Sequence, residues 1–290
     1  MNWHTKNNQF LPQNCPKSDL SILLNETAVT YYWIGFLMAD GHFSEQEIQL
    51  AIVEKNHILK YQKYINTKNY HQRINDAGNF SYHVGARDRK LVPIIKSKFD
   101  INNNKTYNPP TLDIFEKMND RQFMSFFIGF IDGDGCITYN NKKEKGYSKL
   151  TVDNHSSWFN LHKYFLNRIS KITKTNIRSK VCVISKIAPN EKQVKCSHLT
   201  ITNSKILKFL KNKAIEYDLP VLKRKWDKIN LQFFSSKQSA EINKEKIRKL
   251  LKQKPEISIK EIAQKMKFNY KRTWQLIKRM KTKGELNENS

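Results

Sequence analysis

The sequence predicts an α+β fold of two tandem, pseudo-symmetric αββαββα repeats, followed by a small C-terminal module that is all-α or a winged helix-turn-helix. A twelve-residue segment occurs twice, as YWIGFLMADGHF at 32–43 and FFIGFIDGDGCI at 126–137, 94 positions apart. Similar strand and helix patterns follow each copy, which predicts the two repeats. Short helical patterns in a strongly basic stretch after residue 237 predict the module.

These boundaries divide the chain into four parts. We expect an N-terminal extension over 1–24, the first repeat over 25–118, the second over 119–236 and the basic module over 237–290. A length of 290 residues with 39% hydrophobic content is sufficient for packed cores of this kind.

Each repeated segment predicts a buried helix. In the second copy, Asn119 and Gln122 have the spacing of a capping box, and the run 123–131 is apolar almost all round. Gly135 follows the last helical turn, and we expect it to end the helix in the left-handed conformation. A helix with so few polar side chains must be buried.

Small residues recur four positions apart within both helices, at Gly35 and Ala39 and again at Gly129 and Gly133. Small side chains on one helix face let two backbones approach closely, although a glycine inside a helix costs roughly 1 kcal/mol relative to alanine. The spacing therefore predicts that the two helices pack on each other.

The segments after each copy also correspond. Ile48, Leu50 and Ile52 alternate with polar or small residues, as a half-buried strand does, and 147–152 alternates in the same way. Helical patterns, further strands and closing helices then follow at 58–65, 80–84 and 89–99 in the first half and at 158–165, 199–201 and 204–217 in the second.

Each predicted helix ends in an acid, Asp40 in the first copy and Asp134 in the second. A carboxylate at the negative end of a helix dipole is unfavourable, and two such carboxylates side by side repel each other. The pair therefore favours a hard divalent cation, with Mg²⁺ as the expected ion and Mn²⁺ as a substitute. The alternative is that Asp-Gly is only a turn signal after a buried helix.

These residues resemble the motif of the LAGLIDADG homing endonucleases, in the form that carries two motifs in one chain. The matching segments are 33–41 (WIGFLMADG) and 127–135 (FIGFIDGDG), and the resemblance spans about residues 25–228. It implies that Asp40 and Asp134 are the metal-binding catalytic acids. The first copy has Met38 where the second has Asp132, which affects the expected packing of the helix ends rather than the metal ligands.

The resemblance also implies two four-stranded sheets that form a saddle over the DNA major groove. It further implies a catalytic lysine after each half, which matches Lys105 in the first half and either Lys223 or Lys225 in the second, with Lys223 taken first. The strands and hairpins supply polar candidates for contacts with bases and phosphates, namely Gln46, Gln49, Lys142 and Lys149.

The charge balance independently indicates a polyanionic partner. The chain has 52 Lys and Arg against 26 Asp and Glu, a net charge of +26, and nucleic acid is the polymer that such a surplus favours. An AT-rich genome also raises Lys and Asn content, which is the alternative explanation. The four cysteines and eight histidines have no zinc-binding spacing.

No apolar run is long enough to cross a membrane, and the N-terminus lacks a secretory signal pattern. We therefore expect no membrane partner and an intracellular location, in the cytoplasm of a bacterium or phage host or in an organelle matrix.

The basic module, with 16 Lys and Arg against six Asp and Glu from residue 237 onward, predicts three short helices and is similar to winged-helix regulators. Ser258 and Glu261 have capping-box spacing, and Trp274, Ile277 and Met280 suggest the buried face of the last helix. We expect that helix to enter the major groove. Its recognition candidates are Asn269, Tyr270, Lys271, Arg272, Thr273 and Gln275.

Together, these features predict a monomeric, metal-dependent, site-specific endonuclease that hydrolyses both strands of double-stranded DNA at a long recognition site. Two alternatives remain open. One is an intron maturase, with intron RNA as its partner, and the other is a catalytically inactive DNA-binding regulator.

Overall fold

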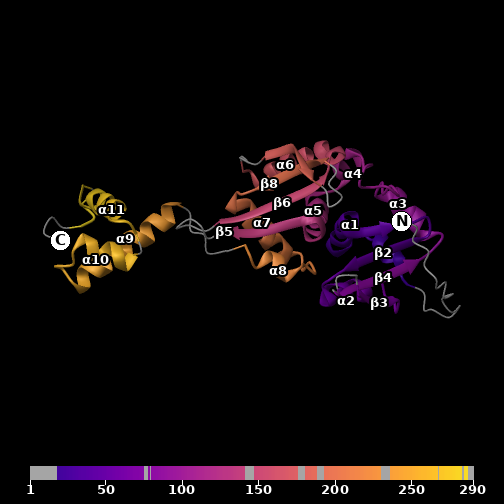
Figure 1. Cartoon of the computed structure of the whole chain (residues 1–290), viewed down its shortest axis with the longest axis horizontal. Helices are drawn as coiled ribbons and strands as arrows, with labels where there is room; N and C mark the ends of the chain where they lie inside the picture. Colours follow the sequence, from indigo (N-terminus) through magenta and orange to yellow (C-terminus); the bar gives the residue numbers. More distant parts are fainter. Residues whose placement is uncertain are drawn as a thin grey trace. The chain divides into compact units, whose positions relative to one another are not determined.

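The structure is a computed structural model that describes residues 18–74, 78, 80–140, 147–175, 180–187, 193–229, 236–266, 268–282 and 284–286. The chain separates into two compact units, residues 1–230 and 231–290 (Figure 1). The predicted tandem αββαββα architecture of the larger unit is confirmed.

The first repeat consists of three helices and one four-stranded sheet. Its elements are α1 (Ala28–Asp40), β1 (Gly41–Phe43), β2 (Glu47–Ile52), α2 (Lys55–Tyr64), β3 (Tyr70–Ile74), β4 (Phe80–Arg87) and α3 (Leu91–Lys98). The antiparallel strands follow the order β1-β2-β4-β3.

The second repeat has the same element order. Its elements are α5 (Asp120–Asp134), β5 (Gly135–Asn140), β6 (Tyr147–His155), α6 (Phe159–Thr173), β7 (Lys180–Ile187), β8 (Gln193–Ile201) and α7 (Ser204–Glu216). The strand order β5-β6-β8-β7 repeats the order of the first sheet. Two further helices, α4 (Leu112–Lys117) and α8 (Lys223–Trp226), follow the first and second repeats respectively.

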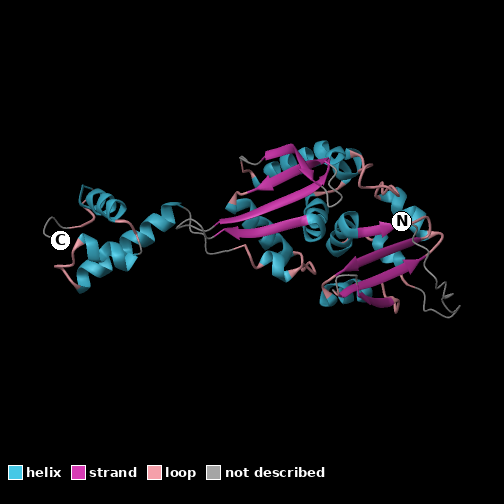
Figure 2. Ribbon diagram, viewed as in Figure 1, coloured by secondary structure: helices cyan, strands magenta, loops and turns pink. Residues whose placement is uncertain are grey.

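Strand alternation determines which face of each sheet is buried, and Figure 2 shows helices against one face of each sheet. In β2 the residues Ile48, Leu50 and Ile52 are buried, while Gln49 and Ala51 are exposed. In β6 the buried residues are Ser148, Leu150 and Val152. Helices therefore cover one face of each sheet, and the opposite face is open and carries the polar side chains.

Helices α1 and α5 lie side by side in the centre of the larger unit (Figure 1). They are buried almost throughout, from Ala28 to Met38 in α1 and from Phe123 to Asp132 in α5. The expected capping box is confirmed, because Asn119 accepts from the Gln122 backbone N–H and the Gln122 side chain accepts from the Asn119 N–H. One continuous hydrophobic core joins the repeats.

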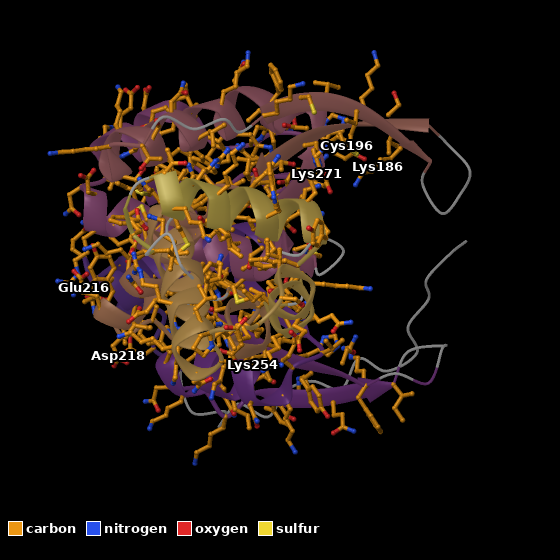
Figure 3. All side chains as sticks on the ribbon, turned by 90° about the vertical axis from the view of Figure 1, so that its left-hand side faces the viewer. Lys186, Cys196, Glu216, Asp218, Lys254 and Lys271 are labelled. Atoms are coloured by element: carbon orange, nitrogen blue, oxygen red, sulfur yellow. The ribbon has the colours of Figure 1, made fainter. Side chains whose placement is uncertain are left out.

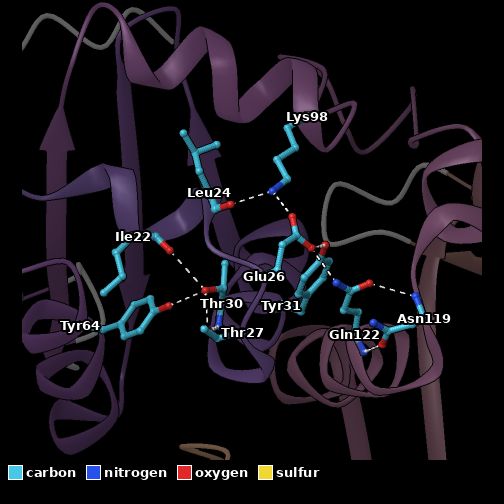
Figure 4. A network of polar contacts seen from close by, with 10 residues as sticks. All are labelled: Ile22, Leu24, Glu26, Thr27, Thr30, Tyr31, Tyr64, Lys98, Asn119 and Gln122. Atoms are coloured by element: carbon cyan, nitrogen blue, oxygen red, sulfur yellow. Dashed lines mark hydrogen bonds and ion pairs between the residues drawn. The ribbon is translucent and has the colours of Figure 1, made fainter.

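A polar network joins the N-terminal ends of these two helices (Figure 4). Glu26 accepts hydrogen bonds from Tyr31 and Lys98 of its own repeat and from Gln122 Nε2 of the second repeat, at 2.6 Å. The ends opposite the two motif aspartates are therefore held together across the repeat boundary.

Part of the expected N-terminal extension belongs to the core. Residues Leu20–Leu24 form a 3₁₀ helix in which Leu20 and Leu23 are fully buried. A five-residue apolar segment outside the repeated pattern has no periodicity long enough to reveal this packing from sequence.

The smaller unit has its own core. Its helices are α9 (Ser236–Gln253), α10 (Ile259–Met266) and α11 (Tyr270–Thr282). Ser258 and Glu261 form the expected capping box at the start of α10. Within the described part of this unit no strand occurs, so a wing is not seen there. Among the described residues of the whole chain, no helix has the length and apolarity required to cross a bilayer.

Candidate metal centre

The central helix pair makes a reciprocal backbone contact at two glycines. A Cβ atom added to Gly35 would lie 2.0 Å from the carbonyl oxygen of Phe126, and one added to Gly129 would lie 1.9 Å from that of Tyr32. Both positions therefore exclude any side chain, and the helices touch backbone to backbone. The contact positions are related by the 94-residue offset of the repeat.

The contact continues to the C-terminal ends of the helices. A Cβ atom on Gly133 would lie 2.3 Å from the Cβ of Ala39 and 3.4 Å from the carboxyl carbon of Asp40. The carboxyl of Asp40 thus lies against the residue that precedes Asp134. The small residues at 35, 39, 129 and 133 all lie in this helix contact.

The expected left-handed conformation of Gly135 is wrong. Gly135 is extended, with φ of −79° and ψ of 147°, and Gly41 is also extended at −73° and 150°. A Cβ atom at either position would lie 2.5 Å from a carbonyl oxygen of the preceding helical turn. Close approach to the helix end, rather than positive φ, explains these glycines.

Both motif acids have raised pKa values. Burial among protein atoms, together with the negative charge of Asp134, raises the pKa of Asp40 to about 6, although its side chain still contacts solvent. Burial also raises the pKa of Asp134, and a hydrogen bond from Asn154 opposes the rise. Burial is thus the main cause of both raised pKa values, and repulsion by the neighbouring carboxylate adds to the rise at Asp40.

Lys105 reaches the end of the first motif helix. Its Nζ donates to the carbonyl oxygens of Met38 at 2.7 Å and Ala39 at 2.6 Å. Burial lowers the pKa of this ammonium group, while Asp134 and Asp40 raise it. Two of its three protons are used on the helix end, which leaves one donor for another oxygen.

In the second half the corresponding lysine is Lys225 and not Lys223, which is exposed. Lys225 is buried, and its Nζ lies 2.6–3.1 Å from four carbonyl oxygens at the end of α5, those of Ile131, Asp132, Gly133 and Gly135. Lys225 lies two residues after Lys223 in the short helix α8 and therefore on a different side of that helix. The run of adjacent basic residues in the sequence does not show which of the two faces the end of α5.

Asp132 is a buried acid whose role the sequence did not indicate. Its carboxylate accepts hydrogen bonds from Tyr32 Oη at 2.7 Å, Trp226 Nε1 at 2.7 Å and the Leu222 backbone N–H at 2.9 Å. Burial raises its pKa to about 6, and the three donors oppose the rise. Asp132, in α5, therefore binds Leu222 and Trp226, which lie before and within α8, and Tyr32 of α1. These hydrogen bonds position α8 so that Lys225 faces the end of α5.

Some of the polar residues that the sequence predicted as DNA contacts lie on the open faces of the two sheets. Gln49 is exposed on β2, and Lys149 lies on the corresponding face of β6. Gln46 lies in the turn before β2 and accepts hydrogen bonds from Arg87 and Arg89. Lys142 lies outside the described residues. Lys186 and Cys196 also project from this second sheet (Figure 3).

The last helix of the smaller unit exposes Lys271 and Gln275 (Figure 3 labels Lys271). Arg272 lies on the same helix, but its side chain is outside the described part of the structure.

Two expectations for this helix are wrong, namely that Thr273 is available to DNA and that Trp274 belongs to the buried face. Thr273 is fully buried and donates to the Asn269 carbonyl, while Trp274 is 41% exposed beneath Lys278. The buried face of this helix therefore consists of positions 273, 277 and 280, instead of the expected 274, 277 and 280. Both sets fit the helical period, and they differ by one residue at the first position.

The acids fit a hard divalent ion. In the described part of the chain, neither Asp40 nor Asp134 forms an ion pair. The two nearby ammonium groups, those of Lys105 and Lys225, donate to helix carbonyl oxygens instead. Among described residues no cluster of three or more His, Cys, Asp or Glu side chains could hold a metal by itself. Two carboxylates suit Mg²⁺, which completes its shell with water and substrate phosphate oxygens.

No protein-family model matches the sequence, and no curated protein does. Solved structures with a similar arrangement include the homing endonuclease I-WcaI bound to its DNA recognition sequence, with a TM-score of 0.46, 12% identity, and coverage of 74% of this chain and 88% of that chain. They also include the LAGLIDADG homing endonuclease I-GzeII in complex with its DNA target (0.38, 13%, 89% and 98%) and I-DmoI in complex with DNA and Ca (0.38, 13%, 63% and 86%). Similarity at this level concerns the arrangement of helices and strands only.

Proposed function

We propose that the protein is a site-specific, metal-dependent endonuclease that cleaves both strands of double-stranded DNA. The observation that carries this proposal is the pair Asp40 and Asp134, brought together at the ends of two crossing helices with raised pKa values. One acid from each repeat matches the need to act on two strands related by a two-fold axis.

In this proposal Asp40 and Asp134 hold Mg²⁺, or Mn²⁺ in its place, against the scissile phosphates. The bound ion supplies charge stabilisation and an activated water for phosphodiester hydrolysis. Lys105 keeps the end of α1 in position through two carbonyls. Its remaining N–H would be available to a phosphate or water oxygen. Lys225 fixes the end of α5, so that the acids hold their separation before DNA binds.

The open sheet faces provide the surface that would follow the DNA major groove. Side chains on them alternate with the buried core residues, so every second residue is available to a base edge or a phosphate. Gln49 and Lys149 belong to this surface, and Gln46 lies beside it in the turn before β2. The net charge of +26 supports binding to a polyanion.

The smaller unit would add a second DNA contact through α11. A short turn separates α10 from α11, and α11 exposes Lys271 and Gln275 beside Lys278 and Arg279. These features support a helix-turn-helix, and in this proposal its second helix enters a major groove. Because the chain contains both catalytic halves, the proposed enzyme acts as a monomer.

Incubation of purified full-length protein with Mg²⁺ and a plasmid tests the proposal. The plasmid carries the uninterrupted insertion site, made by joining directly the two DNA segments that flank the whole intron or other insertion that contains the reading frame. We expect a linear product with one pair of defined ends. Asp40→Asn and Asp134→Asn should abolish the linear product while DNA binding, measured by gel shift, remains.

The same preparation separates the alternatives. Sequence-specific binding with an intact plasmid would contradict the endonuclease and support an inactive regulator. Stimulated splicing of RNA that contains the reading frame, again without DNA cleavage, would support a maturase.

A further inference from the structure

A chain of buried and partly buried hydrogen bonds ends on one of the two acids. Asn154, on β6, donates from Nδ2 to Asp134 Oδ2 at 2.6 Å. Its Oδ1 lies 3.0 Å from Nε2 of His162, on α6, and Nδ1 of His162 lies 2.8 Å from Oγ of Ser197, on β8. His162 and Ser197 are both fully buried. Three elements of the second repeat thus converge on Asp134.

The direction of each hydrogen bond in this chain is fixed. Burial lowers the pKa of His162 to about 4, so its imidazole is neutral near pH 7 and carries one proton. Because Asn154 uses its NH₂ group toward the carboxylate, its oxygen must accept, and His162 donates from Nε2. Nδ1 then accepts from the Ser197 hydroxyl. The amide of Asn154 is therefore locked with its donor toward Asp134.

Among the described residues of the first repeat, no such chain of hydrogen bonds ends on Asp40. Gly41 pairs with Leu50 as Gly135 pairs with Val152, so two residues further along β2 the counterpart of Asn154 is Ile52. Ile52 is apolar and 7% exposed. Within the described part of the chain, no side chain donates a hydrogen bond to Asp40. Within the described part of the chain, a side-chain donor therefore holds Asp134 and none holds Asp40.

We propose that Asn154, His162 and Ser197 are positioning residues for Asp134 alone, which makes the two centres of the endonuclease inequivalent, one for each DNA strand. The inference rests on the proposed function and adds to it a division of roles between the repeats. Loss of the hydrogen-bond chain slows cleavage of one strand and spares the other. The duplex then accumulates as a nicked intermediate.

The test follows the two strands separately. The joined-flank duplex carries a different dye on each 5′ end, and the single-turnover rate for each strand is measured with Mg²⁺. Asn154→Ala and Ser197→Ala should reduce the rate for the same strand by about tenfold or more, because a small displacement of a reacting group costs that much. The rate for the other strand should stay within about twofold of wild type.

A matched control is available on the neighbouring strand. Ser148 is also a buried serine on the helix-facing side, but it donates to the Lys228 carbonyl, outside the chain that ends on Asp134. Ser148→Ala should leave the ratio of the two strand rates unchanged. Equal slowing of both strands by Ser197→Ala, or a change in the ratio with Ser148→Ala, would overturn the inference while the endonuclease stands.

A second readout does not depend on cleavage. Nitrogen-15 NMR of the histidine rings in wild-type protein should show His162 neutral near pH 7 with its proton on Nε2, and Ser197→Ala should shift this signal. A proton on Nδ1 in wild type would overturn the hydrogen-bond chain. A wild-type protein that cuts neither strand would instead overturn the proposed function, and with it this division of roles.

Discussion

Gly35 and Gly129 meet each other's helices at equivalent points, each against the carbonyl oxygen of the residue three positions before the other. The corresponding oxygens belong to Phe126 and Tyr32, and an added Cβ atom would lie 2.0 and 1.9 Å from them. Because the two contacts are reciprocal, a pseudo-two-fold axis passes through the helix contact. It also explains why Asp40 and Asp134, five residues after these glycines, come together.

Replacing Gly129 with alanine should therefore destabilise the larger unit. The new methyl cannot avoid a backbone carbonyl, so we expect a net loss of at least about 2 kcal/mol in the free energy of unfolding, despite the better helix propensity of alanine. Urea denaturation measures this. Gly85→Ala is the control, because the one overlap of its Cβ would be with the flexible end of the Glu47 side chain at 2.8 Å, while Asn69 and Gln49 would lie at ordinary contact distance, 3.5 Å. A loss of similar size there would contradict the explanation.

Asp132→Asn should destabilise the contact between the motif helices and α8. An amide group must place its NH₂ toward at least one of the donors from Tyr32, Trp226 and Leu222, and the Trp226 and Leu222 N–H groups cannot become acceptors. We expect a loss of about 2 kcal/mol, measured by urea unfolding. Met38→Leu, at the equivalent position of the first repeat, should cost less than about 1.5 kcal/mol.

Lys225→Met and Lys223→Met distinguish the two candidate lysines. The first change removes the donor to four carbonyl oxygens at the end of α5, so we expect a loss of about 3 kcal/mol in stability and of DNA cleavage. The second affects an exposed side chain and should change stability by less than about 0.5 kcal/mol. Thermal unfolding and plasmid cleavage measure both, and the reverse order of effects would exclude Lys225.

The raised pKa of Asp40 gives a pH dependence with a definite sign. Because its folded-state pKa of about 6 lies above the ordinary value of 3.8, the folded protein binds the proton more tightly, and this contribution to stability is lost as the pH rises from about 4 to 6. At pH 7.5 without metal, Asp40→Asn should therefore melt about 2 °C higher than wild type, a modest shift because solvent screens this carboxyl.

Divalent metal should reverse the order of the two melting temperatures, so that wild type melts above Asp40→Asn. Mg²⁺ should raise the melting temperature of wild type at pH 7.5 and have a smaller effect on Asp40→Asn, since the variant has lost one carboxylate ligand. A lower melting temperature for metal-free Asp40→Asn than for wild type would contradict the repulsion between the two acids.

Lys271→Gln tests the DNA contact of the smaller unit. If Lys271 neutralises one phosphate, the slope of log affinity against log salt should fall by about one, without a change in cleavage rate at saturating protein. Lys254→Gln is the control, because Lys254 is an exposed lysine of the same unit that pairs with Glu261 at 3.0 Å and lies outside α11 (Figure 3). Equal changes in slope for both variants would contradict a specific role for α11.

The sequence predicted the features that depend on local periodicity and on repetition. The two αββαββα halves follow from alternation in segments such as 48–52, and the helix contact follows from the small residues at 35 and 129. The capping boxes at Asn119 and Ser258 were readable because each uses two residues three positions apart.

Features that depend on long-range contacts were not predictable. Asp132 acquires its role from Tyr32 and Trp226, about a hundred residues away in each direction. The choice of Lys225 over Lys223 depends on the phase of a four-residue helix. Trp274 lies outside the core because a one-residue shift in helical phase buries Thr273 instead.

The most direct test of the central claim is to locate the metal itself. Crystals of the protein with the joined-flank duplex, grown with Mn²⁺, give an anomalous difference map that identifies manganese without reference to activity. We expect manganese bound to the carboxylates of Asp40 and Asp134, next to phosphate oxygens of the DNA. Manganese bound elsewhere on the protein, with none at these two acids, would contradict the account.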